Sequence, residues 1–316
     1  MKKVIVILLC FFTVILTGCS EKENSQTRIL CDTAVTVTAQ CDEEIINQSF
    51  DICAQLEKKL SRTVESSDIW LINNSDEFVS VGEETLALIT RAIEYSEKSG
   101  GRFDITVYPV SSLYDFSSSQ LPEKNEIARA LEKVDYKKIE IKDKKVRLKD
   151  SGLDLGGIAK GYIADKMVEF LKEKGVKRGT VNIGGNLYAF GEGEFKIGIK
   201  KPFESGIIAT VKSTENSFVT SGIYERYIEK DGRIYHHIID TETGYGVENS
   251  LASVTVMGKS SADCDALSTA LLILGEEEGL LLINETEGYE AVFVKRDGSI
   301  LLSEGLKFKK DVIVYK

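Results

Sequence analysis

Apolar residues recur at two spacings along the chain, and each spacing predicts a different kind of element. Recurrence every three to four residues predicts helices over residues 45–60, 85–99, 126–134, 163–174, 262–274 and 277–284. Alternating or β-branched runs predict strands over residues 33–39, 180–183, 187–190, 195–199, 207–212, 251–257, 291–295 and 299–302. Two short strands around a charged turn are expected over 139–148, and a hairpin is expected from 224–229 and 233–239.

The order of these elements indicates the fold class. Strands and helices do not alternate strictly, which disfavours a doubly wound parallel sheet. No internal repeat and no Pro- or Ser-rich linker interrupts residues 29–316. The sequence therefore predicts a single α+β domain over 29–316, with mixed, mainly antiparallel sheets and packed helices.

The start of the chain has the pattern of a targeting signal. A basic Met1-Lys2-Lys3 precedes an almost unbroken apolar run over 4–16, which is short for a membrane span and typical of a signal-peptide core. The run ends in Leu-Thr-Gly-Cys19, which looks like a bacterial lipobox. We expect residues 1–18 to be a signal peptide and residues 19–28 to be a lipidated N-terminus and polar tether. The protein would then be exported and held on the extracytoplasmic face by lipid on Cys19; a cleaved signal with a chance Cys is the alternative.

Composition and charge exclude several classes of protein. With 42% apolar and 28% charged residues the chain is an ordinary globular mixture, so disorder of the whole chain is excluded. The net charge is −10 and no Lys/Arg-rich stripe stands out, so we expect no nucleic-acid partner. There are only two His, which excludes a zinc site built on several of them. The P-loop, the dinucleotide-binding glycine motif and the G-x-S-x-G elbow are all absent.

The six cysteines show no metal-type spacing. Cys10 would leave with the signal, and Cys19 would be the anchor. Cys31, Cys41, Cys53 and Cys264 remain, without a C-x-x-C pair. An exported protein could pair two of them. We favour buried, small apolar residues instead, because a domain of this size has a core without disulfides.

Two glycine-containing segments are candidates for ligand binding. In Ser99–Pro109, a Gly pair after a helix allows positive φ and brings Arg102 and Asp104 beside a turn that a ligand could approach. In Leu153–Tyr162, an apolar strand leads into glycines and then a helix start, whose free N–H groups and Lys160 would attract phosphate. The alternatives are a helix cap followed by a strand and a tight strand-to-helix turn.

Two further segments carry side chains suited to catalysis or to a metal. His236 and His237 lie in a strand-like run, so their rings point to opposite faces and at most one faces a given site. Asp265 and Thr269 are four residues apart on a helix, and a carboxylate and a hydroxyl on one face suit a hard cation such as Mg²⁺. The alternatives are packing or surface histidines, and an Asp that complements the helix dipole.

In this order and spacing, the four segments resemble the ApbE family of FAD:protein FMN transferases, or flavin transferases. The matching strings are SGGRFDITVYPV, LDLGGIAKGYIADK, VNIGGN, TSGIYERY, YHHIIDTETG and ADCDALSTALLILG. The resemblance covers roughly residues 29–305. The lipobox agrees with it, because many family members are lipoproteins.

The resemblance implies a reaction and a set of site residues. The family binds FAD and a divalent metal, usually Mg²⁺, and a Thr or Ser hydroxyl of a target protein attacks the FMN phosphorus while AMP leaves. Exported segments of membrane redox complexes are among the family's targets. By resemblance Asp265, Thr269 and the carbonyl of Gly157 bind the metal, with Ser268 a weaker candidate. By resemblance, too, Arg102, Phe103, Asp104, Asp154, Lys160 and His237 contact FAD, and His237 is the candidate base, with Asp240 or Asp154 as its rivals.

Two departures from the family pattern concern the residues expected to contact the flavin or adenine ring of FAD. Many members carry an aromatic residue where this chain has Val64, in Ser61-Arg62-Thr63-Val64. A Met-Gly-Thr pattern appears here as Cys31-Asp32-Thr33. Both bear on the balance between transfer and hydrolysis, so two alternatives stay open: an Mg²⁺-dependent FAD pyrophosphatase and a flavin-binding lipoprotein without chemistry.

Overall fold

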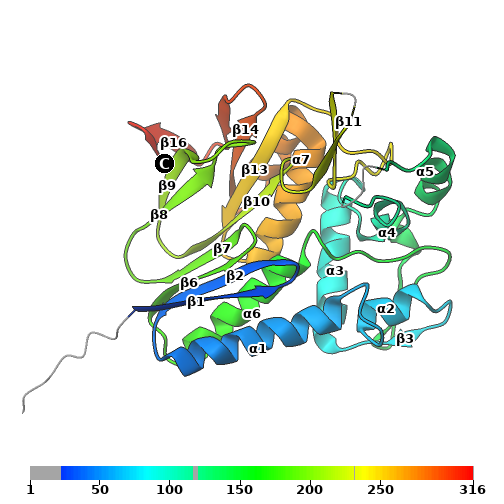
Figure 1. Cartoon of the computed structure of the whole chain (residues 1–316), viewed down its shortest axis with the longest axis horizontal. Helices are drawn as coiled ribbons and strands as arrows, with labels where there is room; N and C mark the ends of the chain where they lie inside the picture. The colour runs from blue at the N-terminus through cyan, green and yellow to red at the C-terminus, as the bar shows by residue number, and fades with distance from the viewer. Residues whose placement is uncertain (1–22, 117–119, 231, 316) are drawn as a thin grey trace, which may run out of the picture.

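The computed structural model describes residues 23–116, 120–230 and 232–315 and confirms an α+β fold (Figure 1). Its main element is an eight-stranded sheet in which every pairing is antiparallel. The strands in spatial order are β1 (Glu23–Leu30), β2 (Thr33–Gln40), β6 (Arg178–Ile183), β7 (Asn186–Gly191), β10 (Asn216–Gly222), β13 (Leu251–Gly258), β14 (Glu290–Lys295) and β15 (Ile300–Leu302).

Three smaller sheets and seven α-helices complete the described part of the chain. The small sheets are β16 (Leu306–Lys309), β17 (Val312–Tyr315), β9 (Ile207–Ser213) and β8 (Phe195–Lys200); β3 (Val79–Ser80), β5 (Lys145–Arg147) and β4 (Glu140–Lys142); and the hairpin β11 (Tyr227–Lys230) and β12 (Arg233–His236). The helices are α1 (Glu43–Leu60), α2 (Asp68–Asn73), α3 (Glu83–Lys98), α4 (Tyr108–Ser111), α5 (Lys124–Leu131), α6 (Ala159–Glu173) and α7 (Ser261–Asn284). Two short 3₁₀ turns span Ile105–Val107 and Tyr136–Lys138.

The large sheet is covered on both faces. Helix α7 packs on β10 and β13, and α6 lies between α7 and α1 (Figure 1). The sheet that contains β9 and β17 covers the opposite face, where Met257 of β13 joins Val211 and Ile313 in one apolar cluster. Every residue of β13 is buried as a result, which explains the almost continuous apolar run in its sequence.

The predicted helices and strands occur except for the apolar strand expected before the glycine segment, where residues 153–155 form no strand. The helices predicted over 262–274 and 277–284 are the two parts of α7, and Gly275 separates them with a φ of 84° that a helix does not allow. Strand β10 was not predicted. Its sequence, NSFVTSG, is mostly polar, yet nearly all of it is buried, so it lacks the alternation that marks a strand.

The polar tether expected over residues 19–28 is wrong from Glu23 on. Residues Glu23–Leu30 form β1, which pairs with β2 along its whole length. Hydroxyl pairs across the two strands, Ser25 with Thr38 and Thr27 with Thr36, replace apolar contacts, so an edge strand with a solvent face needs few apolar residues. The predicted signal peptide and Cys19 lie outside the described residues.

The described cysteines agree with the favoured interpretation. Cys41, Cys53 and Cys264 are buried, Cys31 is half-buried, and all four are thiols in this structure. Among the described residues, no helix has both the length and the apolar character that crossing a membrane requires.

Helices α6 and α7 approach each other closely at their N-termini. A Cβ atom on Gly161 would lie 2.1 Å from the carbonyl oxygen of Ser261, so only glycine permits this crossing. Asp165 of α6 accepts hydrogen bonds from the backbone N–H groups of Ser261 and Ala262, at 2.7 and 3.0 Å, and thereby caps α7. The distance between the two helix starts is therefore fixed by backbone contact.

We expect Gly161→Ala to destabilise the protein by about 2–3 kcal/mol, because the added methyl overlaps backbone atoms that cannot rotate away. Urea unfolding followed by circular dichroism measures the change. Glu173→Ala, at an exposed position of the same helix, is the matched control and should stay within about 0.5 kcal/mol of the parent. Equal stability of the two variants would show that α6 and α7 can move apart without loss of stability.

Candidate functional site

A glycine turn leads into α6 and forms the centre of the candidate site. Residues 153–155 are extended but pair with no strand among the described residues, contrary to expectation; the Asp154 N–H instead donates to the carbonyl of Ile105 at 2.7 Å. The turn at Gly156 and Gly157 follows, and α6 begins at Ala159, four residues earlier than predicted. The start of α6 therefore lies next to the glycines, and the N–H groups of Ile158 and Ala159 there both donate to the carbonyl of Leu155.

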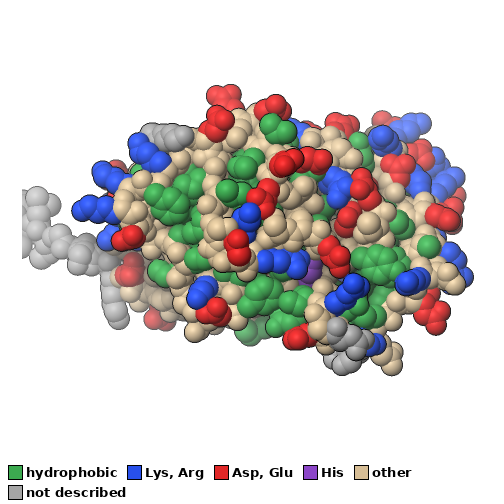
Figure 2. Space-filling model, turned by 90° about the horizontal axis from the view of Figure 1, so that it is seen from above, with side chains coloured by type: hydrophobic (Ala, Val, Ile, Leu, Met, Phe, Trp, Pro, Cys, Tyr) green, Lys and Arg blue, Asp and Glu red, His purple; other side chains and the backbone are tan. Residues whose placement is uncertain are grey.

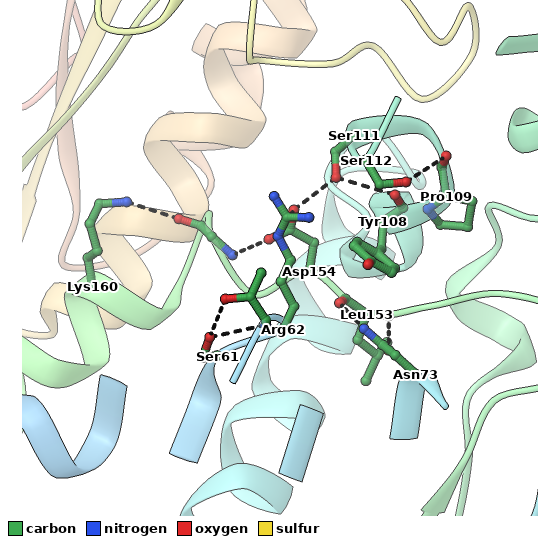
Figure 3. A network of polar contacts seen from close by, with 12 residues as sticks. Ser61, Arg62, Asn73, Tyr108, Pro109, Ser111, Ser112, Leu153, Asp154 and Lys160 are labelled. Atoms are coloured by element: carbon green, nitrogen blue, oxygen red, sulfur yellow. Dashed lines mark hydrogen bonds and ion pairs between the residues drawn. The ribbon is translucent and has the colours of Figure 1, made fainter. Parts of the chain in front are cut away.

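Asp154 holds the turn closed (Figure 3). One carboxylate oxygen accepts from the Gly156 N–H at 2.9 Å, and the other accepts from the Ser111 hydroxyl at 2.9 Å and pairs with Arg62 Nε at 3.4 Å. The Arg62 guanidinium also lies over the Tyr108 ring, 5.1 Å from its centroid. Asp154 therefore positions the turn and Arg62 rather than standing free as a base.

Two cationic side chains flank the glycine turn. Lys160 Nζ donates to the Gly156 carbonyl at 3.0 Å, and Arg62 reaches the turn from the opposite side through Asp154 (Figure 3). Together with the helix start they create a positive region suited to phosphate. Arg62 was not predicted as a site residue; the only signal was its place beside Val64, and both residues lie in the turn that follows α1.

The turn passes directly over Phe103 and beside Thr269. A Cβ on Gly157 would lie 3.0 Å from Phe103 Cε2 and 3.5 Å from Thr269 Oγ1, and the Phe103 ring is buried beneath it. The structure therefore brings Gly157 and Thr269 together, as the resemblance implied. Phe103 supports the turn from below.

Asp265 lies one helical turn before Thr269 and is 3% exposed. Its Oδ2 accepts from the Gly161 N–H at 2.9 Å, so this carboxylate caps the first turn of α6 while Asp165 caps α7. A buried carboxylate with a single backbone donor retains lone pairs for a cation.

A third hydroxyl joins the group. Ser221 Oγ, from β10, lies 3.0 Å from Thr269 Oγ1 and 2.8 Å from Ser268 Oγ. Ser268 is fully buried and donates to the carbonyl of Asp265, so it supports the helix from the sheet side. The sequence did not predict Ser221 as a site residue, because it did not predict the strand β10 that carries it. The one feature that could have indicated it is its position in the family string TSGIYERY.

The side chains around Thr269 that could bind a metal ion would all do so through oxygen atoms. Among the described residues, no group of three or more His, Cys, Asp or Glu side chains is arranged to hold a metal ion. The Asp265 carboxylate and the Thr269 hydroxyl are nevertheless oxygen ligands of the kind that Mg²⁺ takes, since it keeps several waters and binds further oxygens of substrate phosphates. The residues present fit a hard cation and do not fit zinc.

The two histidines differ as their alternation predicted. His236 ends β12, is 1% exposed, and its Nε2 lies 3.0 Å from the carbonyl of Val247, so it is a packing residue. His237 follows the strand and is half-buried, and its Nδ1 lies 3.3 Å from the carbonyl of Arg226. Figure 2 shows a histidine in view on the upper face, bordered by apolar and basic side chains. His237 is thus partly exposed to solvent, whereas His236 is buried.

Burial and nearby cations alter the acidity of His237. Desolvation, followed by the charges of Arg226 and Lys160, lowers the pKa of His237 to about 4. Its ring also packs edge-on against Phe116.

The segment after α3 positions the loop that follows His237. Arg102 pairs with Asp240 at 3.3 Å and with Glu242. Both oxygens of Asp104 are used internally, by the N–H and hydroxyl of Thr106 and by the N–H of Tyr136, and burial raises the pKa of this carboxyl. Arg102 therefore holds the loop in place through an ion pair that engages Asp240, a rival base, whereas Asp104 stabilises the turns at Thr106 and Tyr136.

These residues form a polar site with two cationic side chains and a group of oxygens, built where two helix N-termini meet the end of an antiparallel sheet. The model of the ApbE family matches residues 31–293, and the chain belongs to this family.

Relatives and a solved structure agree with this membership. The chain is similar to an FAD:protein FMN transferase of Klebsiella pneumoniae, with 34% identity over 83% of this chain and 85% of the relative. It is 32% identical to an FAD:protein FMN transferase of Treponema pallidum, over 83% of this chain and 80% of the relative. The crystal structure of the ApbE protein from Thermotoga maritima superposes with a TM-score of 0.83 at 30% identity, covering 90% of this chain and 97% of that one.

Proposed function

We propose that this chain transfers FMN from FAD to a Thr or Ser hydroxyl of a target protein and releases AMP. The relatives that carry this activity in their names match the chain over most of its length. The observation that supports the proposal most directly is the glycine turn itself, which lies between Lys160 and Arg62 and beside Thr269. This arrangement suits the pyrophosphate of FAD.

The residues around the turn divide into binding and proton-transfer roles. Lys160 and Arg62 bind the phosphate oxygens, and the partial positive charge at the N-terminus of α6 favours the same anion. Asp265, Thr269 and the carbonyl of Gly157 would hold Mg²⁺, which when bound neutralises phosphate charge and makes AMP a better leaving group. The acceptor oxygen forms a bond to the FMN phosphorus, and the bond to the AMP phosphate breaks with its electron pair on AMP.

His237 would accept the proton of the acceptor hydroxyl. Its Nδ1 faces the carbonyl of Arg226, which can only accept a hydrogen bond, so Nδ1 carries the hydrogen and Nε2 carries the lone pair. With a pKa of about 4 the ring is neutral at pH 7 and ready to accept a proton.

The test of the proposal is product analysis with a candidate acceptor. Purified protein is incubated with FAD, Mg²⁺ and a protein segment that carries an exposed Thr or Ser, and the segment is weighed by mass spectrometry. Transfer gives an FMN adduct and an equal amount of AMP. AMP without an adduct indicates hydrolysis, in which water replaces the hydroxyl, and no AMP indicates a binding protein; either result would contradict transfer.

For the metal site, we expect Asp265→Asn to raise the Mg²⁺ concentration needed for half-maximal activity by at least ~10-fold. The amide oxygen can still accept from Gly161 N–H, so the cap on α6 is kept while the charge is lost. Asp263→Asn is the matched control, because this carboxylate pairs with Arg91 and Tyr289 away from the glycine turn. An unchanged Mg²⁺ requirement in Asp265→Asn would place the cation elsewhere.

For the base, His237→Ala should lower kcat by roughly 10²–10⁴ while FAD still binds. The parent's kcat/KM should stay level from pH 7 to about pH 5 and fall with a midpoint near pH 4, because protonation removes the acceptor lone pair. In His236→Ala we expect lower stability but normal turnover per folded molecule. A midpoint near 6.5, the unperturbed value of histidine, would refute the assigned environment of His237.

We also propose that the protein is a lipoprotein, anchored on the extracytoplasmic face through Cys19. The support is the basic start, the apolar run and the Leu-Thr-Gly-Cys sequence. Its acceptor would then be a protein, or a domain of a membrane redox complex, on the same face.

In the test of anchoring, Cys19→Ser should move the protein from the membrane fraction to the soluble fraction when the full chain is exported, because one covalent lipid signal is lost. Immunoblotting of the two fractions measures this, with Cys10→Ser as the control that keeps the anchor. Equal membrane retention of parent and Cys19→Ser would contradict lipidation.

A further inference from the structure

Two cysteines that lie 22 positions apart in the sequence touch each other in the fold. Cys31 occupies the turn between β1 and β2, and Cys53 lies in the middle of α1. Their Sγ atoms are 3.8 Å apart. Cys53 is fully buried and Cys31 is half-buried, so one sulfur of the pair is reachable from outside.

The backbone at Cys31 is unusual for this residue. Cys31 and Asp32 have φ values of 53° and 55°, which makes the two-residue connection a turn in which glycine and asparagine are favoured. A cysteine at positive φ costs free energy, and an observed outlier of this kind calls for a reason. The Cys31 N–H donates to Glu57 Oε1 at 2.7 Å, one turn beyond Cys53, so the strained turn is held against α1 with its sulfur over Cys53.

We propose that Cys31 and Cys53 form a disulfide bond when the protein meets an oxidant of the disulfide class. The thiolate of Cys31 attacks an external disulfide and expels one thiolate, which leaves a mixed disulfide on Cys31. Cys53 then attacks the sulfur of Cys31 and expels the second thiolate. The two cysteines lose two electrons and two protons, and the external disulfide becomes two thiols.

The bond would join the first hairpin to α1 and immobilise one end of the large sheet. Thr33 follows the turn, and its hydroxyl lies against Gly184, where a Cβ would be only 2.5 Å away. The next residue, Gly185, accepts from the Thr220 N–H of β10, the strand that carries Ser221. The disulfide would thus fix the strand ends beside the glycine turn. The proposal rests on the short distance between the two sulfur atoms and does not depend on flavin transfer.

The test uses the purified full chain equilibrated with oxidised or with reduced glutathione. After alkylation of the remaining thiols and proteolysis, mass spectrometry should find the Cys31 and Cys53 peptides joined, with the loss of two hydrogen atoms, in the oxidised sample only. Cys264 should be alkylated in both samples after unfolding. Oxidation should raise Tm by roughly 5–10 °C, because the crosslink restricts the unfolded chain.

Two single variants separate this bond from other effects of oxidation. Cys31→Ser should remove the redox dependence of Tm, whereas Cys41→Ser, which keeps the pair, should retain it. The proposal is overturned if both peptides remain fully alkylatable after equilibration, if Cys31 carries only glutathione, or if Cys31→Ser still shows the shift. Faster hydrogen exchange at Thr33 and Gly184 in the reduced parent, and in Cys31→Ser under either condition, would confirm the mechanical consequence.

Discussion

The site depends on reciprocal capping where α6 meets α7. Asp265 of α7 accepts from the backbone of α6, Asp165 of α6 accepts from the backbone of α7, and Gly161 lets the two backbones touch. Each helix start is therefore satisfied by a carboxylate from the other. Because Thr269 follows Asp265 by one turn and Gly157 precedes α6, this crossing also determines how far the glycine turn lies from the hydroxyl.

The same crossing gives Asp265 two uses. Its carboxylate stabilises the N-terminus of α6, and it supplies the charge of the proposed cation site. A buried carboxylate is costly unless it is hydrogen-bonded or paired with positive charge. The backbone donor from Gly161 keeps it in place before any cation arrives, so the site is preorganised by an interaction that the fold needs in any case.

The sequence could predict what depends on local spacing. Asp265 and Thr269 were found because four residues make about one helical turn. The apolar spacing also predicted two helices, over 262–274 and 277–284, and the break at Gly275 lies between them. Arg62 and Ser221 could not be found in this way, since each acquires its role from a partner far along the chain, Asp154 and Thr269 respectively. Strand β1 was taken for a tether because its polar side chains are satisfied across the sheet edge, a contact that is invisible before β2 is placed beside it.

The small sheet on the opposite face of β13 has a consequence for biosynthesis. Its strand β17 follows every other described strand in sequence, yet it lies inside this sheet, between β16 and β9, and it pairs with β9 in parallel. Ile313 of β17 completes the apolar layer that covers Met257. This layer cannot close on a nascent chain before β17 has left the ribosome. One face of the central strand therefore stays uncovered until β17 is available, and in that interval the chain exposes an aggregation-prone surface.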